Sequence, residues 1–127
     1  METKAISTPN APKAIGPYSQ AVKAGDFLFV SGQIPIDPAT GLLEPADIEL
    51  QTNRVFKNLE AILEEAGLDF SSVLKSTVLL TDIDDFSKVN EIYASYINNH
   101  PLPARAAFQV SALPKGALIE IELIAHF

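Results

Sequence analysis

Arg105 is the residue of this chain whose charge most clearly requires a partner. It stands in an apolar stretch, residues 103–110, and the chain has a single other arginine, Arg54. A guanidinium group is always ionised, and burying it without a partner is costly in free energy. Either a carboxylate of the protein or an anionic ligand must therefore pair with Arg105. The planar guanidinium suits a ligand carboxylate, because two parallel N–H donors can meet both carboxylate oxygens.

The composition is that of one globular domain over residues 1–127 with an acidic surface. The chain is 47% hydrophobic and 20% charged, and its formal net charge of -7 gives a pI near 4.6. An acidic balance repels phosphate backbones, so nucleic acid is a poor partner. The chain has no cysteine, and His100 and His126 lack a metal-ligand spacing, so we expect no metal. No stretch matches a signal peptide or a membrane span, so we expect a cytoplasmic protein with no membrane partner.

Turn signals organise the N-terminal third of the chain. Strand-forming residues at 18–22 and 27–31 flank residues 24–26, whose alanine, glycine and aspartate favour a hairpin. The proline and glycine within residues 37–41 predict an exposed turn. The first two strands are therefore expected to pair, with a loop after them.

Capping residues predict two helices in the rest of the chain. The first helix is expected to begin after Asp47 and to end at Gly67, with an apolar stripe between them. The second is expected to be capped by Asp84 or Asp85 and to stop before Pro101. Further strands are predicted at residues 73–81, 104–110 and 117–125. This order is typical of an α+β domain with both helices against one face of a mixed sheet.

The last predicted strand has one apolar and one mixed face. The apolar face holds Ile119, Ile121 and Leu123, and the mixed face holds Leu118, Glu120, Glu122 and Ile124. A mixed face without helices to cover it favours association with copies of the chain, so we expect a homo-oligomer. Alternation also groups Arg105 with Ala107 and Gln109. If the larger neighbours of Arg105 pack under the helices, Arg105 shares the oligomeric face with Glu120.

A series of short motifs, spread over almost the whole chain, resembles the RidA subgroup of the Rid proteins, the reactive intermediate deaminases. The motifs are Ala14-Ile15-Gly16-Pro17-Tyr18-Ser19-Gln20-Ala21, Val30-Ser31-Gly32-Gln33-Ile34-Pro35, Asn58-Leu59 with Ala66-Gly67-Leu68, Pro103-Ala104-Arg105, and Leu113-Pro114-Lys115-Gly116 ahead of Ile119-Glu120-Ile121-Glu122. Each motif is weak alone, and their order makes the resemblance specific.

The resemblance implies a chorismate-mutase-like (ferredoxin-like) fold, a homotrimer with clefts between neighbouring subunits, and no cofactor or metal. The family hydrolyses 2-imino acids. Its substrate-carboxylate arginine falls on Arg105 and its water-positioning glutamate on Glu120. The residues that line its pocket match Tyr18, Ser31, Gly32 and Asn90. Where many members carry a cysteine this chain has Ala107, whose backbone N–H and C=O can still bind substrate or water.

The charged residues also have structural interpretations. Arg105 can form an ion pair with Glu120 or Glu122 that only ties strands or subunits together. Glu120 is by default a solvated strand residue, and beside a bound imine it can hold a water and take its proton. Glu122 is interpreted as structural, with an exchange of roles with Glu120 as the alternative. Arg54 is interpreted as a surface or interface ion-pair residue.

The uncharged residues have similar alternatives. Tyr18 can be a core or interface aromatic rather than a wall of the cleft. Ser31 and Gly32 can be ordinary turn residues rather than a hydroxyl and a close backbone approach to substrate. Asn90 borders the apolar stripe of the second helix, where an amide needs hydrogen-bond partners, so it suits support as well as direct contact.

The function expected from these residues is cofactor-independent hydrolysis of a small 2-imino acid. The products of 2-iminopropanoate, 2-iminobutanoate and related compounds of amino-acid metabolism are 2-keto acids and ammonia. Arg105 holds the carboxylate and Glu120 the water. The rivals are a chorismate-mutase-like isomerase, which the few arginines disfavour, and a non-catalytic trimer that binds small carboxylates or acts as a chaperone or regulator. Ribonuclease activity is disfavoured by the acidic charge and the lack of a basic stripe.

Overall fold

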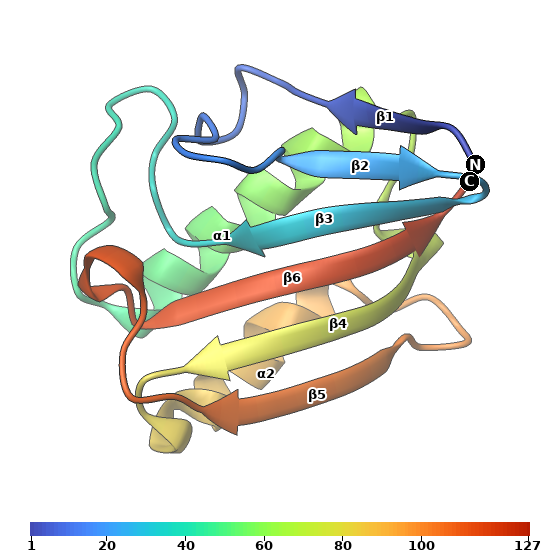
Figure 1. Ribbon diagram of the computed structural model, residues 1–127. Helices are drawn as coiled ribbons and strands as arrows, with labels where there is room; N and C mark the ends of the chain where they lie inside the picture. Colours follow the sequence, from blue (N-terminus) through green and yellow to red (C-terminus); the bar gives the residue numbers. More distant parts are fainter.

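Six strands form one mixed sheet, drawn face-on in Figure 1. The computed structural model describes residues 1–127. In chain order the strands are β1 (Thr3–Ile6), β2 (Ala21–Ala24), β3 (Phe27–Gln33), β4 (Val73–Leu80), β5 (Ala104–Gln109) and β6 (Ile119–His126). Across the sheet the order is β1-β2-β3-β6-β4-β5, with β4 and β5 parallel and the other neighbours antiparallel. Helices α1 (Ile48–Glu65) and α2 (Phe86–Tyr96) lie behind one face, which confirms the predicted α+β class (Figure 1).

Helix α1 begins and ends where its capping residues predict. The Asp47 carboxylate accepts a hydrogen bond from the Leu50 N–H at 3.0 Å. At the other end Gly67 has a φ of 77°, a left-handed conformation that glycine adopts without strain. The side that packs on the sheet is fully buried at Val55, Phe56, Leu59, Ile62 and Leu63. Neither helix is long and apolar enough to cross a membrane.

Helix α2 is entered through a short turn rather than through the predicted caps. A 3₁₀ turn, Ile83–Asp85, precedes the helix, and Asp82 caps that turn by accepting from the Asp84 N–H at 2.9 Å. Asp85 occupies the N-cap position of α2 and makes no capping bond with its side chain. Several closely spaced aspartates can each cap a helix, and the direction in which the chain leaves β4 decides which one does.

The N-terminal part of the sheet differs from the prediction. The sequence did not predict strand β1, because this short and mostly exposed edge strand carries no alternation of buried and exposed residues. Strand β2 begins later than residue 18, since the buried Gln20 ties its segment to residues 8–12: the side-chain amide donates to three of their carbonyls and accepts one N–H. The hairpin between β2 and β3 is confirmed, with Gly25 at a φ of 59°.

The two faces of the sheet differ in what covers them. On the helix-covered face, Ile119 and Ile121 of β6 belong to the hydrophobic core. The opposite side, here called the open face, carries Glu120 and has no helix against it. Phe29 and Phe108 on this open face are 47% and 48% exposed. The apolar and mixed faces predicted for the last strand are therefore confirmed.

The expectation that Arg105 shares the open face with Glu120 is wrong. Strand β5 pairs in parallel with β4 so that Arg105 lies opposite Ser76, whose side chain is buried on the helix-covered face. Ala107 packs against the core on that same face, and Phe108 points to the open face instead. Alanine buries little apolar surface, so the composition of β5 gives only a weak preference for one face, and strand pairing decides.

Candidate active site

Arg105 is held against α2 by an amide and two aromatic rings. Its Nη1 donates to Oδ1 of Asn90 at 2.7 Å, and its Cζ lies 5.1 Å from the ring centroid of Phe86 and 4.8 Å from that of Tyr93. These rings stabilise the cation without neutralising it. The only ion pairs in the chain involve Arg54, so Arg105 has no carboxylate partner. The pairing of Arg105 with Glu120 or Glu122 is therefore absent within the chain, and N–H donors remain free for an anion.

The surface beneath Arg105 is fixed by the strand next to it. Ser76 of β4 lies opposite Arg105, and its hydroxyl is 2.7 Å from the Tyr93 hydroxyl in a buried hydrogen bond. This bond fixes the Tyr93 ring on which the guanidinium rests. Asn90 accepts a hydrogen bond from Arg105 and also lines a cavity, so both support and direct contact remain open to it.

The backbone of β5 places further hydrogen-bonding groups beside Arg105. Strand β5 is the edge of the sheet, and the Val110 N–H that follows it donates to the Leu80 carbonyl of β4 at 2.8 Å. Along a strand the backbone groups of successive residues point to opposite sides. Those of Arg105 and Ala107 therefore point away from β4, toward the free edge. The Ala107 methyl packs against the core, so the backbone of this residue is what can meet a ligand.

Glu120 is a partly buried carboxylate on the open face, directly over the backbone of Gly32. A Cβ added to Gly32 would approach the Glu120 Cδ to 2.8 Å, so only glycine leaves room for this carboxylate. Burial raises the pKa of the Glu120 carboxyl above its ordinary value, and the charge of Glu122 raises it further. A carboxylate with raised proton affinity is a stronger base than a solvated glutamate while it remains ionised.

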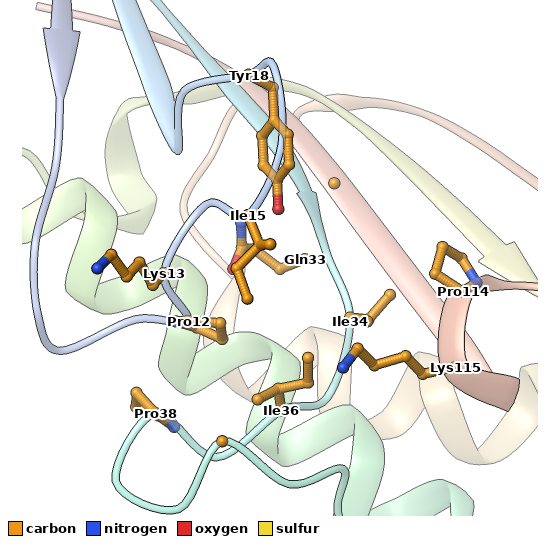
Figure 2. A pocket seen from close by; sticks show the side chains of 12 residues that line it. Pro12, Lys13, Ile15, Tyr18, Gln33, Ile34, Ile36, Pro38, Pro114 and Lys115 are labelled. Atoms are coloured by element: carbon orange, nitrogen blue, oxygen red, sulfur yellow. The ribbon is translucent and has the colours of Figure 1, made fainter.

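Tyr18 and Ser31 belong to the same region as Glu120 and Gly32. The Ser31 hydroxyl donates to the Ser19 carbonyl at 2.6 Å, and the Ser31 N–H donates to the Gln20 carbonyl at 2.9 Å. Ser31 thus anchors the loop that carries Tyr18, and its hydroxyl keeps only acceptor capacity for a ligand. Tyr18 is 54% exposed, and Figure 2 shows its hydroxyl directed into a cavity.

That cavity has a volume of about 580 Å³, and its wall includes Gly32, whose backbone lies next to the Glu120 carboxylate. Tyr18 and Gly32 are part of its wall, and Lys115 contributes from the turn before β6. A second cavity of about 610 Å³ lies between α2 and the segment that leads into β5. Asn90 and Arg105 are part of its wall. Both volumes are in the range of small-ligand sites.

The predicted site residues form two groups that the fold of the single chain does not bring together. One group is Arg105, Asn90 and Ala107; the other is Tyr18, Ser31, Gly32 and Glu120. Arg105 pairs with Ser76 of β4, and Glu120 pairs with Leu79 of the same strand. The two residues are therefore offset by roughly 10 Å along β4. The two side chains also leave opposite faces of the sheet. A small acid is too short to contact both groups within the single chain.

Arg54 is the ion-pair residue that the sequence predicts. Its Nε donates to Oε1 of Glu44 at 3.1 Å, and its Nη2 lies 3.7 Å from Oδ2 of Asp37. These contacts pin the segment between β3 and α1, whose Pro38 and Gly41 line the outer part of the 580 Å³ cavity. Arg54 therefore shapes a wall and takes no direct part in either group.

Three residues near the site received no functional role from the sequence. Phe86 lies under Arg105, and its spacing of four residues from Asn90 places both on one side of α2, which is a signal that could have found it. Gln20 organises the loop of Tyr18 through long-range bonds that no local pattern reveals. Lys115 lines the cavity beside Glu120. The motif that contains Lys115 places it in a turn but does not indicate where its side chain points.

Comparison with known proteins identifies the family of this chain. The sequence model of the family described as endoribonuclease L-PSP matches residues 8–127. A RutC family protein of Pyrococcus horikoshii is 58% identical over 121 residues, which are 95% of this chain and 95% of that protein. The 2-iminobutanoate/2-iminopropanoate deaminase of Rattus norvegicus is 56% identical over 122 residues, 96% of this chain and 88% of that protein. The solved structure of the Rid protein YyfA from Yersinia pestis has a TM-score of 0.97 at 51% identity and covers 99% of this chain and 100% of its own. Sequence and structure matches over almost the whole length show that the chain belongs to the Rid family.

Proposed function

We propose that the protein hydrolyses small 2-imino acids, such as 2-iminopropanoate and 2-iminobutanoate, to 2-keto acids and ammonia. We further propose that it acts as a homotrimer with sites between neighbouring subunits. The observation that carries this proposal is the separation of Arg105 and Glu120, which are both without an ion-pair partner and lie on opposite faces of one sheet. In an oligomer, Arg105 of one subunit can lie beside Glu120 of its neighbour, because Arg105 lies at a free sheet edge and Glu120 on an uncovered face.

The chemistry requires orientation and proton transfer. Arg105 binds the carboxylate of the substrate and so fixes the adjacent imine carbon. Glu120 takes a proton from a water molecule, whose oxygen attacks that carbon, and passes this proton to the nitrogen as the C=N double bond becomes a single bond. Glu120 then takes the hydroxyl proton of the resulting carbinolamine and gives it to the nitrogen, so that the C–N bond breaks and ammonia leaves as the carbonyl forms. The sum is one imine and one water converted to one keto acid and one ammonia.

Two further observations support the proposal. The aromatic side chains of the open face, Phe27, Phe29 and Phe108, are about half exposed in the single chain, which favours their burial against a neighbour. The second is the name of the 56% identical rat relative, 2-iminobutanoate/2-iminopropanoate deaminase, which supports the proposed reaction. A mass measurement in solution tests the trimer.

Mixing two inactive variants tests whether the site is shared between subunits. Arg105→Ala and Glu120→Gln are each expected to be inactive alone, because each lacks one group in every site. In any mixed trimer one site receives Arg105 from one subunit and Glu120 from the next. Random reassembly of equal amounts should therefore restore about one quarter of the wild-type activity.

The assay follows keto-acid release from 2-iminobutanoate, generated by an amino-acid oxidase, with and without protein. Recovery of activity in the reassembled mixture supports a shared site, and no recovery in verified mixed trimers contradicts it. If wild-type protein does not accelerate hydrolysis but still binds small carboxylates, the protein is the non-catalytic binding module instead.

Gly32→Ala is expected to lower kcat/KM by roughly 100-fold, because the new methyl group displaces the Glu120 carboxylate and small misplacements of a catalytic group have effects of that size. The same change in a Glu120→Gln background should have little further effect, since the displaced base is already lost. Steady-state kinetics of the single and double variants provide the test. Additive losses would mean that Gly32 acts independently of Glu120.

A further inference from the structure

Lys115 has an unusual backbone conformation at the edge of the cavity beside Glu120. Its φ is 58°, and it is the only non-glycine residue of the chain with a positive φ. It lies in the short turn Pro114–Gly116, closed by the bond from the Ala117 N–H to the Pro114 carbonyl at 3.2 Å. The left-handed region is uncommon for lysine and is adopted where the surrounding structure imposes it. This turn immediately precedes the strand that carries Glu120.

The Lys115 side chain extends into the cavity and has no acidic partner. Figure 2 shows its ammonium group directed toward Ile34 and Ile36 across the cavity. Both ion pairs of the chain belong to Arg54, so no carboxylate lies within ion-pair reach of Lys115. No aspartate or glutamate lines the cavity. Lys13 also lines it, but in Figure 2 its ammonium group points away from the interior.

The cavity thus has a largely apolar wall, and of its two lysines only Lys115 directs its ammonium group inward. Isoleucine and proline are six of the twelve lining residues, and the volume of about 580 Å³ exceeds what the ethyl group of 2-iminobutanoate fills. An apolar wall receives methylene groups, and a lone ammonium group receives an anion at their end. A short hydrocarbon chain that ends in a carboxylate matches both properties.

We propose that Lys115 makes the site selective for dicarboxylic 2-imino acids, with the ammonium group binding the carboxylate of the substrate side chain. The inference rests on the proposed function, in which Arg105 of the neighbouring subunit binds the first carboxylate. Gly32 connects the two regions, because it contacts Glu120 and also lines the cavity. A substrate attacked beside Glu120 can therefore extend its side chain toward Lys115.

The test compares two imines on the same protein. Imine from L-glutamate or L-aspartate, made by the corresponding oxidase, supplies the dicarboxylic substrate, and imine from 2-aminobutanoate supplies the neutral side chain. Lys115→Met is expected to lower kcat/KM for the dicarboxylic imines about tenfold and to leave kcat/KM for 2-iminobutanoate within about twofold of wild type. Lys115→Arg should retain most of the selectivity, and Lys13→Met, which removes the same charge from the same cavity, should have a smaller effect.

Binding of unreactive acids gives a readout that does not depend on catalysis. Calorimetry with glutarate and butanoate should show that Lys115→Met weakens the binding of glutarate alone. Equal losses for both imines, or no loss for either, would overturn the proposal even if the protein is a deaminase. Failure of wild-type protein to hydrolyse any imine, with glutarate binding still dependent on Lys115, would instead overturn the proposed function and leave the diacid site in place.

Discussion

Arg105→Ala is expected to lower kcat/KM for 2-iminobutanoate by about 10²–10³-fold, because truncating one member of a desolvated charge pair costs roughly 2–5 kcal/mol. The substrate loses its carboxylate anchor, so the imine carbon is no longer fixed in front of the attacking water. The fold should survive, since Arg105 has no ion pair and its side-chain contacts are Asn90 and two ring faces. Steady-state kinetics with the oxidase-coupled assay measure the effect.

Arg105→Lys is the matched control for charge. Lysine keeps the positive charge but not the planar pair of donors or the stacking on Phe86 and Tyr93, so we expect it to recover only part of the lost activity. A second control is the binding of a plain carboxylate such as butanoate, which should weaken in parallel with kcat/KM. Wild-type kinetics in Arg105→Ala would show that the guanidinium does not bind substrate.

Glu120→Gln is expected to lower kcat by about 10²–10⁴-fold with a smaller change in KM, because the amide retains the shape of the side chain and cannot act as a base. The pH dependence of wild-type activity should also report the ionisation of Glu120. Since burial and Glu122 raise the pKa of Glu120, activity should fall as the pH drops through a value above that of an ordinary glutamate. Glu122→Gln removes the like charge, so this acidic limb should move to lower pH while the maximal rate is retained.

Stability provides the control that separates catalysis from structure. A carboxyl group whose folded-state pKa lies above its unfolded value destabilises the folded state at neutral pH, and this effect is lost as the pH falls through the folded pKa. Glu120→Gln should therefore keep or raise Tm at neutral pH while activity is lost. A fall in both Tm and activity would assign Glu120 a structural role.

Local signals account for the parts of the fold that the sequence predicts correctly. Asp47, Gly67 and Gly25 act through their own dihedral angles and hydrogen bonds to residues a few positions away, so their effects can be read from neighbouring letters. Glu120 could be assigned to the open face for a similar reason, because its buried neighbours Ile119 and Ile121 fix the alternation of β6.

The position of Arg105 depended on tertiary structure instead. The alanines that flank Arg105 on β5 have no strong preference for either face of the sheet. The parallel register with β4 therefore places the guanidinium against Phe86 and Tyr93 rather than beside Glu120. Register and strand order join residues that are far apart along the chain, and no local pattern encodes them.

The sequence by itself thus determined the types of group available, a guanidinium and a carboxylate, and the elements that carry them. Only the tertiary structure decided that these groups leave opposite faces of one sheet, and that Lys115 points into the cavity next to Glu120. The physical reason is that side-chain chemistry and short-range hydrogen bonding belong to a residue and its neighbours, whereas the face and direction of a side chain are set by contacts across the sheet.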